Sequence, residues 1–185
     1  MMRIITGKAR GVRLRTLEGE STRPTAERTK EAIFSMLQFE IEGRVVLDAF
    51  AGSGQMGLEA LSRGASKAVL IDKSKKAVEV IKKNVELTRM GESATVLCAD
   101  VGDHLKRMSG REQYDIVFLD PPYSIGLLQE ALSKLDKVIK DTSTVICEHP
   151  YGENVPDFAG NLPKFRQYKY GKVAVTVYKR GEIDG

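Results

Sequence analysis

From residue 44 onward, short apolar runs of strand length alternate with segments of helical periodicity. The expected strands are Arg44–Asp48, Ala68–Ile71, Ala94–Leu97, Ile116–Leu119 and Thr144–Cys147, and the expected helices are Ser53–Arg63, Ser74–Arg89, Val101–Met108 and Ile125–Lys140. The strand runs are continuously apolar, which is typical of strands covered by helices on both faces of a sheet. Repeated strand–helix units of this kind predict a doubly wound, mostly parallel α/β sheet.

The C-terminal part of the chain departs from this alternation. Phe165–Tyr170 and Val173–Lys179 flank Gly171 and Lys172, a pattern that predicts two strands joined by a tight turn. We therefore expect a mostly parallel, seven-stranded sheet that is closed by a C-terminal antiparallel hairpin.

The positive charge of the chain is concentrated at its N-terminus. Residues 1–17 carry five basic residues and no acidic one, and the other 168 carry 24 basic and 25 acidic residues, so +5 and −1 make up the net +4. The five basic residues are Arg3, Lys8, Arg10, Arg13 and Arg15. Alternation of these residues with apolar ones after Gly11 predicts a small β-hairpin arm with a basic face.

This arm, residues 1–22, precedes a body that spans residues 23–185. A basic arm on a neutral body is the charge distribution expected of a protein that binds a polyanion such as nucleic acid. A hairpin whose charges only keep it soluble is the other interpretation.

Composition excludes several classes of protein. The chain has 185 residues, of which 42% are hydrophobic and 29% charged, as expected for one folded unit without disulfides. Cys98 and Cys147 lie in apolar runs, so we expect two buried free thiols in a reducing cytoplasm. No uncharged apolar run approaches the roughly 18 residues of a membrane span, and no signal peptide is evident. His104 and His149 stand alone, so no metal site is expected.

A glycine-rich loop follows the first expected strand and opens a helix. Gly52, Gly54 and Gly57 have the spacing G-x-G-x-x-G, which allows a tight turn and leaves helix N–H groups free for a ligand. A ligand-free turn would have the same sequence. Asp48, at the strand end, would repel a pyrophosphate but attract an α-ammonium group. Asp72, after the second strand, is placed to bind a ribose diol.

These features together predict a nucleoside that carries an amino acid, S-adenosylmethionine, with NAD(P) as the rival ligand. Asp100 ends the third strand, where it would accept a hydrogen bond from an adenine amino group, cap the following helix, or do both. The candidate cofactor contacts are Asp48, Phe50, Gly52, Ser53, Gly54, Asp72, Asp100 and Val101.

The fourth expected strand runs directly into Asp120-Pro121-Pro122-Tyr123. Two consecutive prolines fix the backbone there, so the Asp120 carboxylate and the Pro121 carbonyl form a rigid pair of acceptors. Such a pair can hold both hydrogens of a planar amino group while the Tyr123 ring stacks on the base that carries it. A strand exit stiffened by proline without any chemistry is the alternative.

Five segments resemble one known family of methyltransferases. They are Arg3-Ile-Ile-Thr-Gly-Lys, Arg23-Pro-Thr, Ala49-Phe50-Ala51-Gly52-Ser53-Gly54, Gly57-Leu58-Glu59-Ala60-Leu61-Ser62-Arg63-Gly64-Ala65 and Phe118-Leu119-Asp120-Pro121-Pro122-Tyr123. The pattern resembles the RsmD family, bacterial enzymes acting on guanine N2 of small-subunit ribosomal RNA. Gln55 in the glycine loop is one small departure, and it leaves the glycines intact.

The resemblance implies a Rossmann-like class I methyltransferase that transfers methyl from S-adenosylmethionine to guanine N2 in 16S ribosomal RNA, with that RNA held in a small-subunit assembly. It implies catalytic roles for Asp120, Pro121 and Tyr123, and places Arg23 and Thr25 over the active site. Arg23, Thr25 and Arg28 are therefore RNA-binding candidates, in addition to the five basic residues of the arm. A capped helix with surface arginines is the other interpretation of these three residues. The rivals are an adenine-N6 or cytosine-N4 DNA methyltransferase and a non-enzymatic RNA-binding protein.

Overall fold

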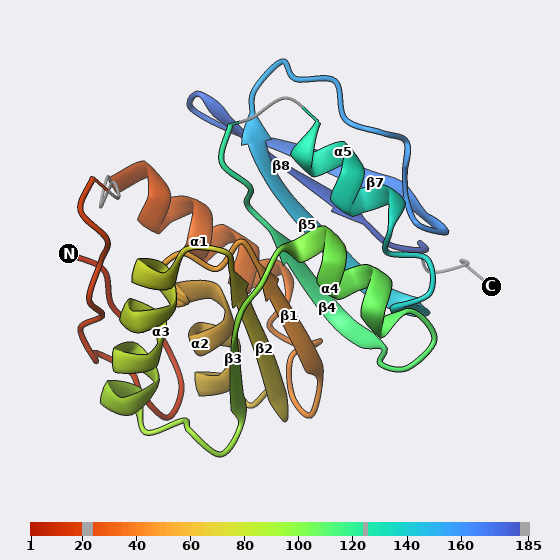
Figure 1. Ribbon diagram of the computed structural model, residues 1–185. Helices are drawn as coiled ribbons and strands as arrows, with labels where there is room; N and C mark the ends of the chain where they lie inside the picture. Colours follow the sequence, from red (N-terminus) through yellow and green to blue (C-terminus); the bar gives the residue numbers. More distant parts are fainter. Residues whose placement is uncertain (20–23, 124–125, 182–185) are drawn as a thin grey trace.

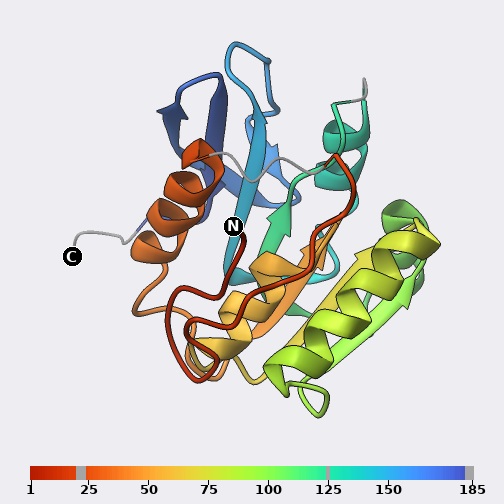
Figure 2. The same ribbon diagram turned by 90° about the vertical axis from the view of Figure 1, so that its left-hand side faces the viewer.

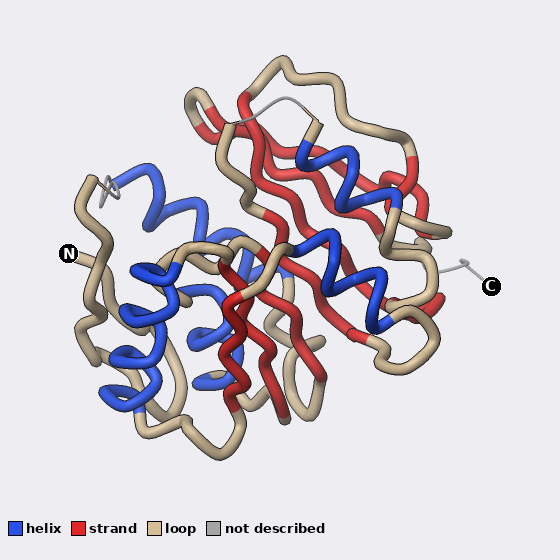
Figure 3. Tube along the Cα trace, in the orientation of Figure 1, coloured by secondary structure: helices blue, strands red, loops and turns tan. Residues whose placement is uncertain are grey.

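The computed structural model describes residues 1–19, 24–123 and 126–181, with only the backbone described at 24 and 25. The helices are α1 (Pro24–Met36), α2 (Gln55–Ser62), α3 (Lys75–Thr88), α4 (Val101–Met108) and α5 (Leu127–Ser133). The strands are β1 (Val45–Ala49), β2 (Lys67–Asp72), β3 (Ala94–Cys98), β4 (Tyr114–Leu119), β5 (Ile139–Pro150), β6 (Phe158–Ala159), β7 (Leu162–Tyr170) and β8 (Val173–Tyr178). Figures 1 and 3 show their arrangement.

Within those ranges the strands form one sheet of eight, in the order β3-β2-β1-β4-β5-β8-β7-β6. Strands β1 to β5 pair in parallel, and β8 runs antiparallel to β5 and to β7. The predicted α/β sheet with a closing C-terminal hairpin is therefore confirmed. The eighth strand, β6, was not predicted, because a two-residue strand beside β7 leaves no periodic pattern in the sequence.

Helices cover both faces of the sheet, as the continuously apolar strands predicted. On one face α1, α2 and α3 share a core with Val46, Leu70 and Phe118. On the other face α4 and α5 pack against Leu47, Val117 and other residues of the alternate parity. In Figure 1 the two sets of helices lie on opposite sides of the central strands.

The last expected helix, Ile125–Lys140, is much shorter in the structure. α5 ends at Ser133, and the chain turns back into β5 from Ile139; Ile125 lies outside the described residues. The carbonyl of Leu132, which would accept the N–H of Asp136 in a continuing helix, accepts the N–H of Gly160 at 3.0 Å and that of Leu135 at 3.4 Å. Leu135 and Val138 are fully buried in this turn, so their spacing resembled a helical stripe without being one.

The N-terminal segment lies across α2 and is joined to it, as Figure 2 shows. Arg3 and Arg13 form one antiparallel bridge, and the N–H of Ile4 donates to the carbonyl of Val12 at 2.9 Å, so the segment is a hairpin with a single bridge. Ile4 and Leu14 are buried in the core. The five predicted basic residues of the arm are all exposed.

Glu59 of α2 is the anchor of this arm. Its side chain is fully buried, and it accepts the N–H groups of Ile5 at 2.8 Å and Thr6 at 3.0 Å. Lys30, itself 4% exposed, pairs with it at 3.1 Å, and Arg63 donates to it at 2.9 Å. The arm is thus fixed by a buried charge cluster, and its removal would take two backbone donors away from that cluster.

Asn84 of α3 provides a second attachment. Its side-chain oxygen accepts the N–H of Arg15 at 2.8 Å, and its amide donates to the carbonyls of Arg15 at 3.0 Å and Ser53 at 2.8 Å. One buried asparagine therefore connects the arm to the glycine-rich loop.

The expectation of two buried thiols is half confirmed. Cys147 on the central strand β5 is buried, and that burial raises the pKa of its thiol. Cys98 is exposed, because it ends β3, the edge strand of the sheet. Over the described ranges, no helix is both long and apolar enough to cross a membrane.

Candidate active site

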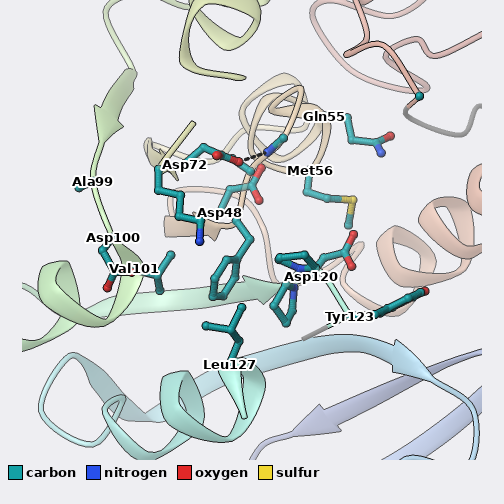
Figure 4. Close-up of a pocket in the computed structure, with 17 residues that line it drawn as sticks. Asp48, Gln55, Met56, Asp72, Ala99, Asp100, Val101, Asp120, Tyr123 and Leu127 are labelled. Carbon is teal, nitrogen blue, oxygen red and sulfur yellow. Dashed lines mark hydrogen bonds between the residues drawn. The ribbon is translucent and has the colours of Figure 1, made fainter. Parts of the chain in front are cut away.

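A cavity of about 610 Å³ opens where the carboxyl ends of β1, β2, β3 and β4 meet (Figure 4). The predicted site residues that line it are Asp48, Phe50, Gly52, Asp72, Asp100, Val101, Asp120, Pro121 and Tyr123. The structure therefore brings together the end of each of the four parallel strands, as expected for a ligand site in an open α/β sheet.

Two predicted cofactor residues, Ser53 and Gly54, do not line this cavity. Ser53 is buried and its hydroxyl donates to Sδ of Met2 at 3.1 Å. Gly54 has φ of 81°, and a Cβ there would lie 3.0 Å from Leu70 and 3.2 Å from Ile81. Glycine is thus required at position 54 by the backbone conformation and by packing against β2 and α3.

The glycine-rich loop keeps its backbone close to the cavity. Phe50 and Gly52 have φ of 59° and 58°, in the left-handed region that costs a side-chain-bearing residue such as Phe50 free energy. This conformation turns the chain sharply out of β1, so that the N-terminus of α2 faces the cavity.

Asp48 stabilises that helix N-terminus. Its carboxylate is 3% exposed, and Oδ2 accepts the N–H of Gly57 at 2.8 Å. A Cβ at Gly57 would lie 2.9 Å from the Leu70 side chain and 3.2 Å from the Cβ of Asp48, so glycine allows α2 to pack closely against β1 and β2 here. Asp48 still lines the cavity, and a buried negative charge there favours a cationic ligand group.

Asp72 and Asp100 lie toward one end of the cavity and Asp120 and Tyr123 toward the other (Figure 4). Asp72 accepts the N–H groups of Gly52 at 3.0 Å and Ser74 at 2.8 Å, which fixes its carboxylate at the cavity wall. Asp100 accepts the N–H of Asp103 at 3.1 Å, so the helix-capping interpretation of this residue is confirmed.

The Asp-Pro-Pro-Tyr segment leaves the fully buried strand β4 at the far end. Pro121 is buried, whereas Asp120 and Tyr123 are exposed, the Tyr123 residue to 72%. Partial burial, followed by the negative charges of Glu148 and Asp120, raises the pKa of the Tyr123 phenol. The ring is therefore neutral and open to a partner from solution.

A second cavity of about 250 Å³ adjoins the first, and both are lined by Asp48, Gln55, Met56, Asp120 and Tyr123. It also includes Lys30 and Glu148, which were not predicted as site residues. For Glu148 a signal existed, since it directly follows the expected strand Thr144–Cys147, just as Asp120 follows its strand.

Helix α1, which carries Arg28, packs in the same core as Ile4 and Leu14 of the arm. Gly19, at the end of the described arm, lines the larger cavity, so the arm leads to the site. Arg28 is exposed on α1, and Thr25 lies in the first turn of that helix. Arg23 falls outside the described residues. In the part of the chain that the structure describes, no three His, Cys, Asp or Glu side chains form a metal-binding group.

The sheet order, the glycine-rich loop after β1 and the Asp-Pro-Pro-Tyr exit from β4 define a class I methyltransferase fold. A solved structure titled "Putative methyltransferase yhhF from Escherichia coli" superposes with a TM-score of 0.83 at 34% identity, covering 97% of each chain. A Thermus thermophilus protein of 33% identity gives 0.82 and covers 97% of this chain and 100% of its own.

The sequence comparisons are more specific. The family model described as Conserved hypothetical protein 95 matches residues 2–179, and the chain belongs to this family, the RsmD family. Ribosomal RNA small subunit methyltransferase D of Escherichia coli is 34% identical over 188 residues, which cover 99% of this chain and 93% of that protein. The Haemophilus influenzae protein of the same name is 40% identical over 135 residues, 72% of this chain and 70% of its own.

Proposed function

We propose that this protein transfers a methyl group from S-adenosylmethionine to the exocyclic N2 amine of a guanine in 16S ribosomal RNA. The observation that carries the proposal is that Asp120 and Tyr123 line both cavities, of about 610 and 250 Å³, and that Pro121 lies between them in the wall of the larger one. Relatives of this chain are named as methyltransferases of small-subunit ribosomal RNA, which supports RNA as the substrate.

The larger cavity fits S-adenosylmethionine by its size and by its donor set. Its volume lies within the range of about 300–1,000 Å³ that is usual for small-molecule sites. Asp72 and Asp100 would hold the ribose hydroxyls and the adenine amine, and buried Asp48 would face the α-ammonium group. A pyrophosphate would meet three carboxylates here, which disfavours NAD(P). When bound, the cofactor supplies an electrophilic methyl group on a sulfonium.

The chain's own residues then prepare the acceptor amine. The nitrogen of a guanine amino group is conjugated with the ring, so its lone pair is poorly available. Asp120 and the carbonyl of Pro121 accept its two hydrogens, turn the lone pair toward the cofactor, and stabilise the positive charge that develops on nitrogen. Tyr123 stacks on the base and fixes its plane, and the rigid prolines keep these groups in position.

The arm supplies the RNA contacts outside this site. Its five basic residues are exposed and the chain after them leads to the cavity through Gly19. Residues 1–22 are thus proposed as an RNA-binding arm on a methyltransferase body of residues 23–185, with Arg23, Thr25 and Arg28 proposed as further RNA contacts. The partner is 16S ribosomal RNA within a small-subunit assembly, in the cytoplasm.

The product nucleoside tests the function directly. Incubation with labelled S-adenosylmethionine and unmethylated 16S RNA, free or in small subunits, should yield labelled N2-methylguanosine after digestion to nucleosides. N6-methyladenosine or N4-methylcytidine would favour the rival amine substrates, and label on a ring carbon or ribose oxygen would exclude the amine mechanism. RNA binding without any transfer of label would favour the other alternative, a non-enzymatic RNA-binding protein.

The arm is tested by charge removal. Deletion is unsuitable, because it would expose the buried Glu59 cluster. Replacement of Lys8, Arg10 and Arg13 by glutamine should weaken RNA binding. It should also flatten the dependence of log Kd on log salt by about 0.7–0.9 for each phosphate group that the arm no longer neutralises. Filter binding at several salt concentrations measures the slope.

The matched control for the arm is a triple variant on α3. Lys75, Lys82 and Lys83 are also exposed, so their replacement by glutamine removes the same charge from another surface. An equal change of slope in both triple variants would show that the arm has no specific role and that only net charge matters.

A further inference from the structure

We infer that Glu148 selects guanine by accepting the N1–H group of the base whose N2 amine is held by Asp120. This inference rests on the proposed function and adds a specificity-determining residue to the site. Three properties of Glu148 carry it: its position beside Asp120, its location in the smaller cavity, and the absence of any hydrogen bond or salt bridge to its side chain among the described residues.

The sheet register places the two carboxylates side by side. Leu119 of β4 pairs with Cys147 of β5, and these strands are parallel, so the next residues, Asp120 and Glu148, follow on adjacent strands. Neighbouring strands lie about 4.8 Å apart. Residues directly opposite in register also point to the same face, here the face on which Phe118 and Ile146 pack in the core shared with α1.

The smaller cavity is the space that these two residues share. It is lined by Glu148, Asp120 and Tyr123 together with Ile33 and Phe118, so an apolar floor lies beneath the two carboxylates. Because the cavity adjoins the larger one at Asp120 and Tyr123, a base in it would present its amine toward the cofactor.

The side chain of Glu148 has no hydrogen bond and no salt bridge within residues 1–19, 24–123 and 126–181. Lys30, the cation in the same cavity, pairs with Glu59 and donates to the carbonyl of Arg3. Burial therefore raises the pKa of Glu148 without any compensating donor. A half-buried carboxylate of this kind is stabilised by a donor from the substrate.

Guanine supplies that donor in the right place. Its Watson–Crick edge carries the N2 amine and the N1–H group next to each other, two donors for two adjacent carboxylates. Adenine and cytosine present an unprotonated ring nitrogen beside their amine, and its lone pair would face Glu148. Asp120 thus binds the reacting amine, and Glu148 distinguishes the base that carries it.

The test compares guanine with 2-aminopurine, which keeps the N2 amine but has an acceptor at N1. After the methylated guanine is mapped with the wild-type protein, RNA is ligated with either base at that position and supplied in the form that is methylated. The wild-type protein should prefer guanine in kcat/KM by about 10–100-fold. Glu148→Gln, whose amide can donate to N1, should reduce that preference to within about threefold by losing guanine activity and gaining 2-aminopurine activity.

The control is Glu153→Gln, which removes a nearby exposed carboxylate and should retain the wild-type preference. Calorimetric cofactor binding confirms that each variant is folded. If Glu148→Gln lowers kcat/KM on both bases by the same factor, the residue is structural and the inference is overturned while the proposed function stands. If the wild-type protein methylates no guanine, the proposed function and the inference both fail.

Discussion

Replacement of Asp120 by alanine should lower the methyl-transfer rate by about 10²–10³-fold, the usual cost of removing one group that stabilises charge in a transition state. The dissociation constants of cofactor and RNA should stay within a few-fold of wild type. The reason is that the contact with the amine strengthens only as the nitrogen becomes tetrahedral and positively charged. Single-turnover kinetics with labelled cofactor, alongside calorimetry for cofactor binding, measures the two quantities separately.

Variants of the Asp120–Tyr123 segment distinguish hydrogen-bond acceptance by Asp120 from base stacking by Tyr123. Asp120→Asn should retain more activity than Asp120→Ala, because its amide oxygen still accepts one hydrogen bond. Tyr123→Phe should be tolerated, whereas Tyr123→Ala should lose about 1–3 kcal/mol of base stacking. Turnover near the wild-type level in Asp120→Ala would show that the amine is not held in the proposed way.

The largest effect on stability is expected at Glu59, far from the reacting groups. Glu59→Ala should lower the free energy of unfolding by about 3–5 kcal/mol, because it leaves Lys30 buried and charged without its partner. It also removes the acceptor for the N–H groups of Ile5 and Thr6. Urea unfolding followed by circular dichroism should show a strongly reduced midpoint.

The pH dependence of that loss identifies its cause. Burial lowers the pKa of Lys30 in the folded protein, so the unfolded state binds more protons and this group contributes stability that rises with pH. Glu59 opposes this lowering, so its removal lowers the pKa of Lys30 further, and raising the pH toward the ordinary lysine value of about 10.4 should narrow the difference in unfolding free energy between Glu59→Ala and wild type. Glu79→Ala, at an exposed glutamate on α3, should change stability by less than about 0.5 kcal/mol. A gap that does not depend on pH would assign the loss to the backbone contacts alone.

The parallel sheet could be predicted because its strands are buried on both faces and are therefore continuously apolar. Val45-Val46-Leu47 and Ile116-Val117-Phe118-Leu119 carry that signal without help from the rest of the chain. α5 could not be bounded in the same way. Its end is set by a hydrogen bond from Gly160 to Leu132, which depends on the tertiary fold.

In the candidate site, too, some features could be predicted from local sequence and others depend on tertiary contacts. Asp48, Asp72, Asp100 and Asp120 each lie at the end of a predicted strand, and parallel strands bring their carboxyl ends together, so their convergence on one cavity was predictable. The orientation of Ser53 away from that cavity was not, because it depends on Met2, 51 residues earlier in the chain. The anchoring role of Glu59 was hidden for the same reason, since a glutamate within a helix normally indicates a solvated position.

The attachment of the arm through Glu59 and Asn84 has a consequence for biosynthesis. The arm is translated before α2 and α3: the partner of Arg15 follows it by 69 residues, and the partner of Ile5 by 54. At about 5–20 residues per second, Asn84 is added roughly 3–14 s after Arg15. The five positive charges of the arm therefore belong to an unattached segment for seconds of every synthesis. This basic surface is fixed in place only after α3 has been made.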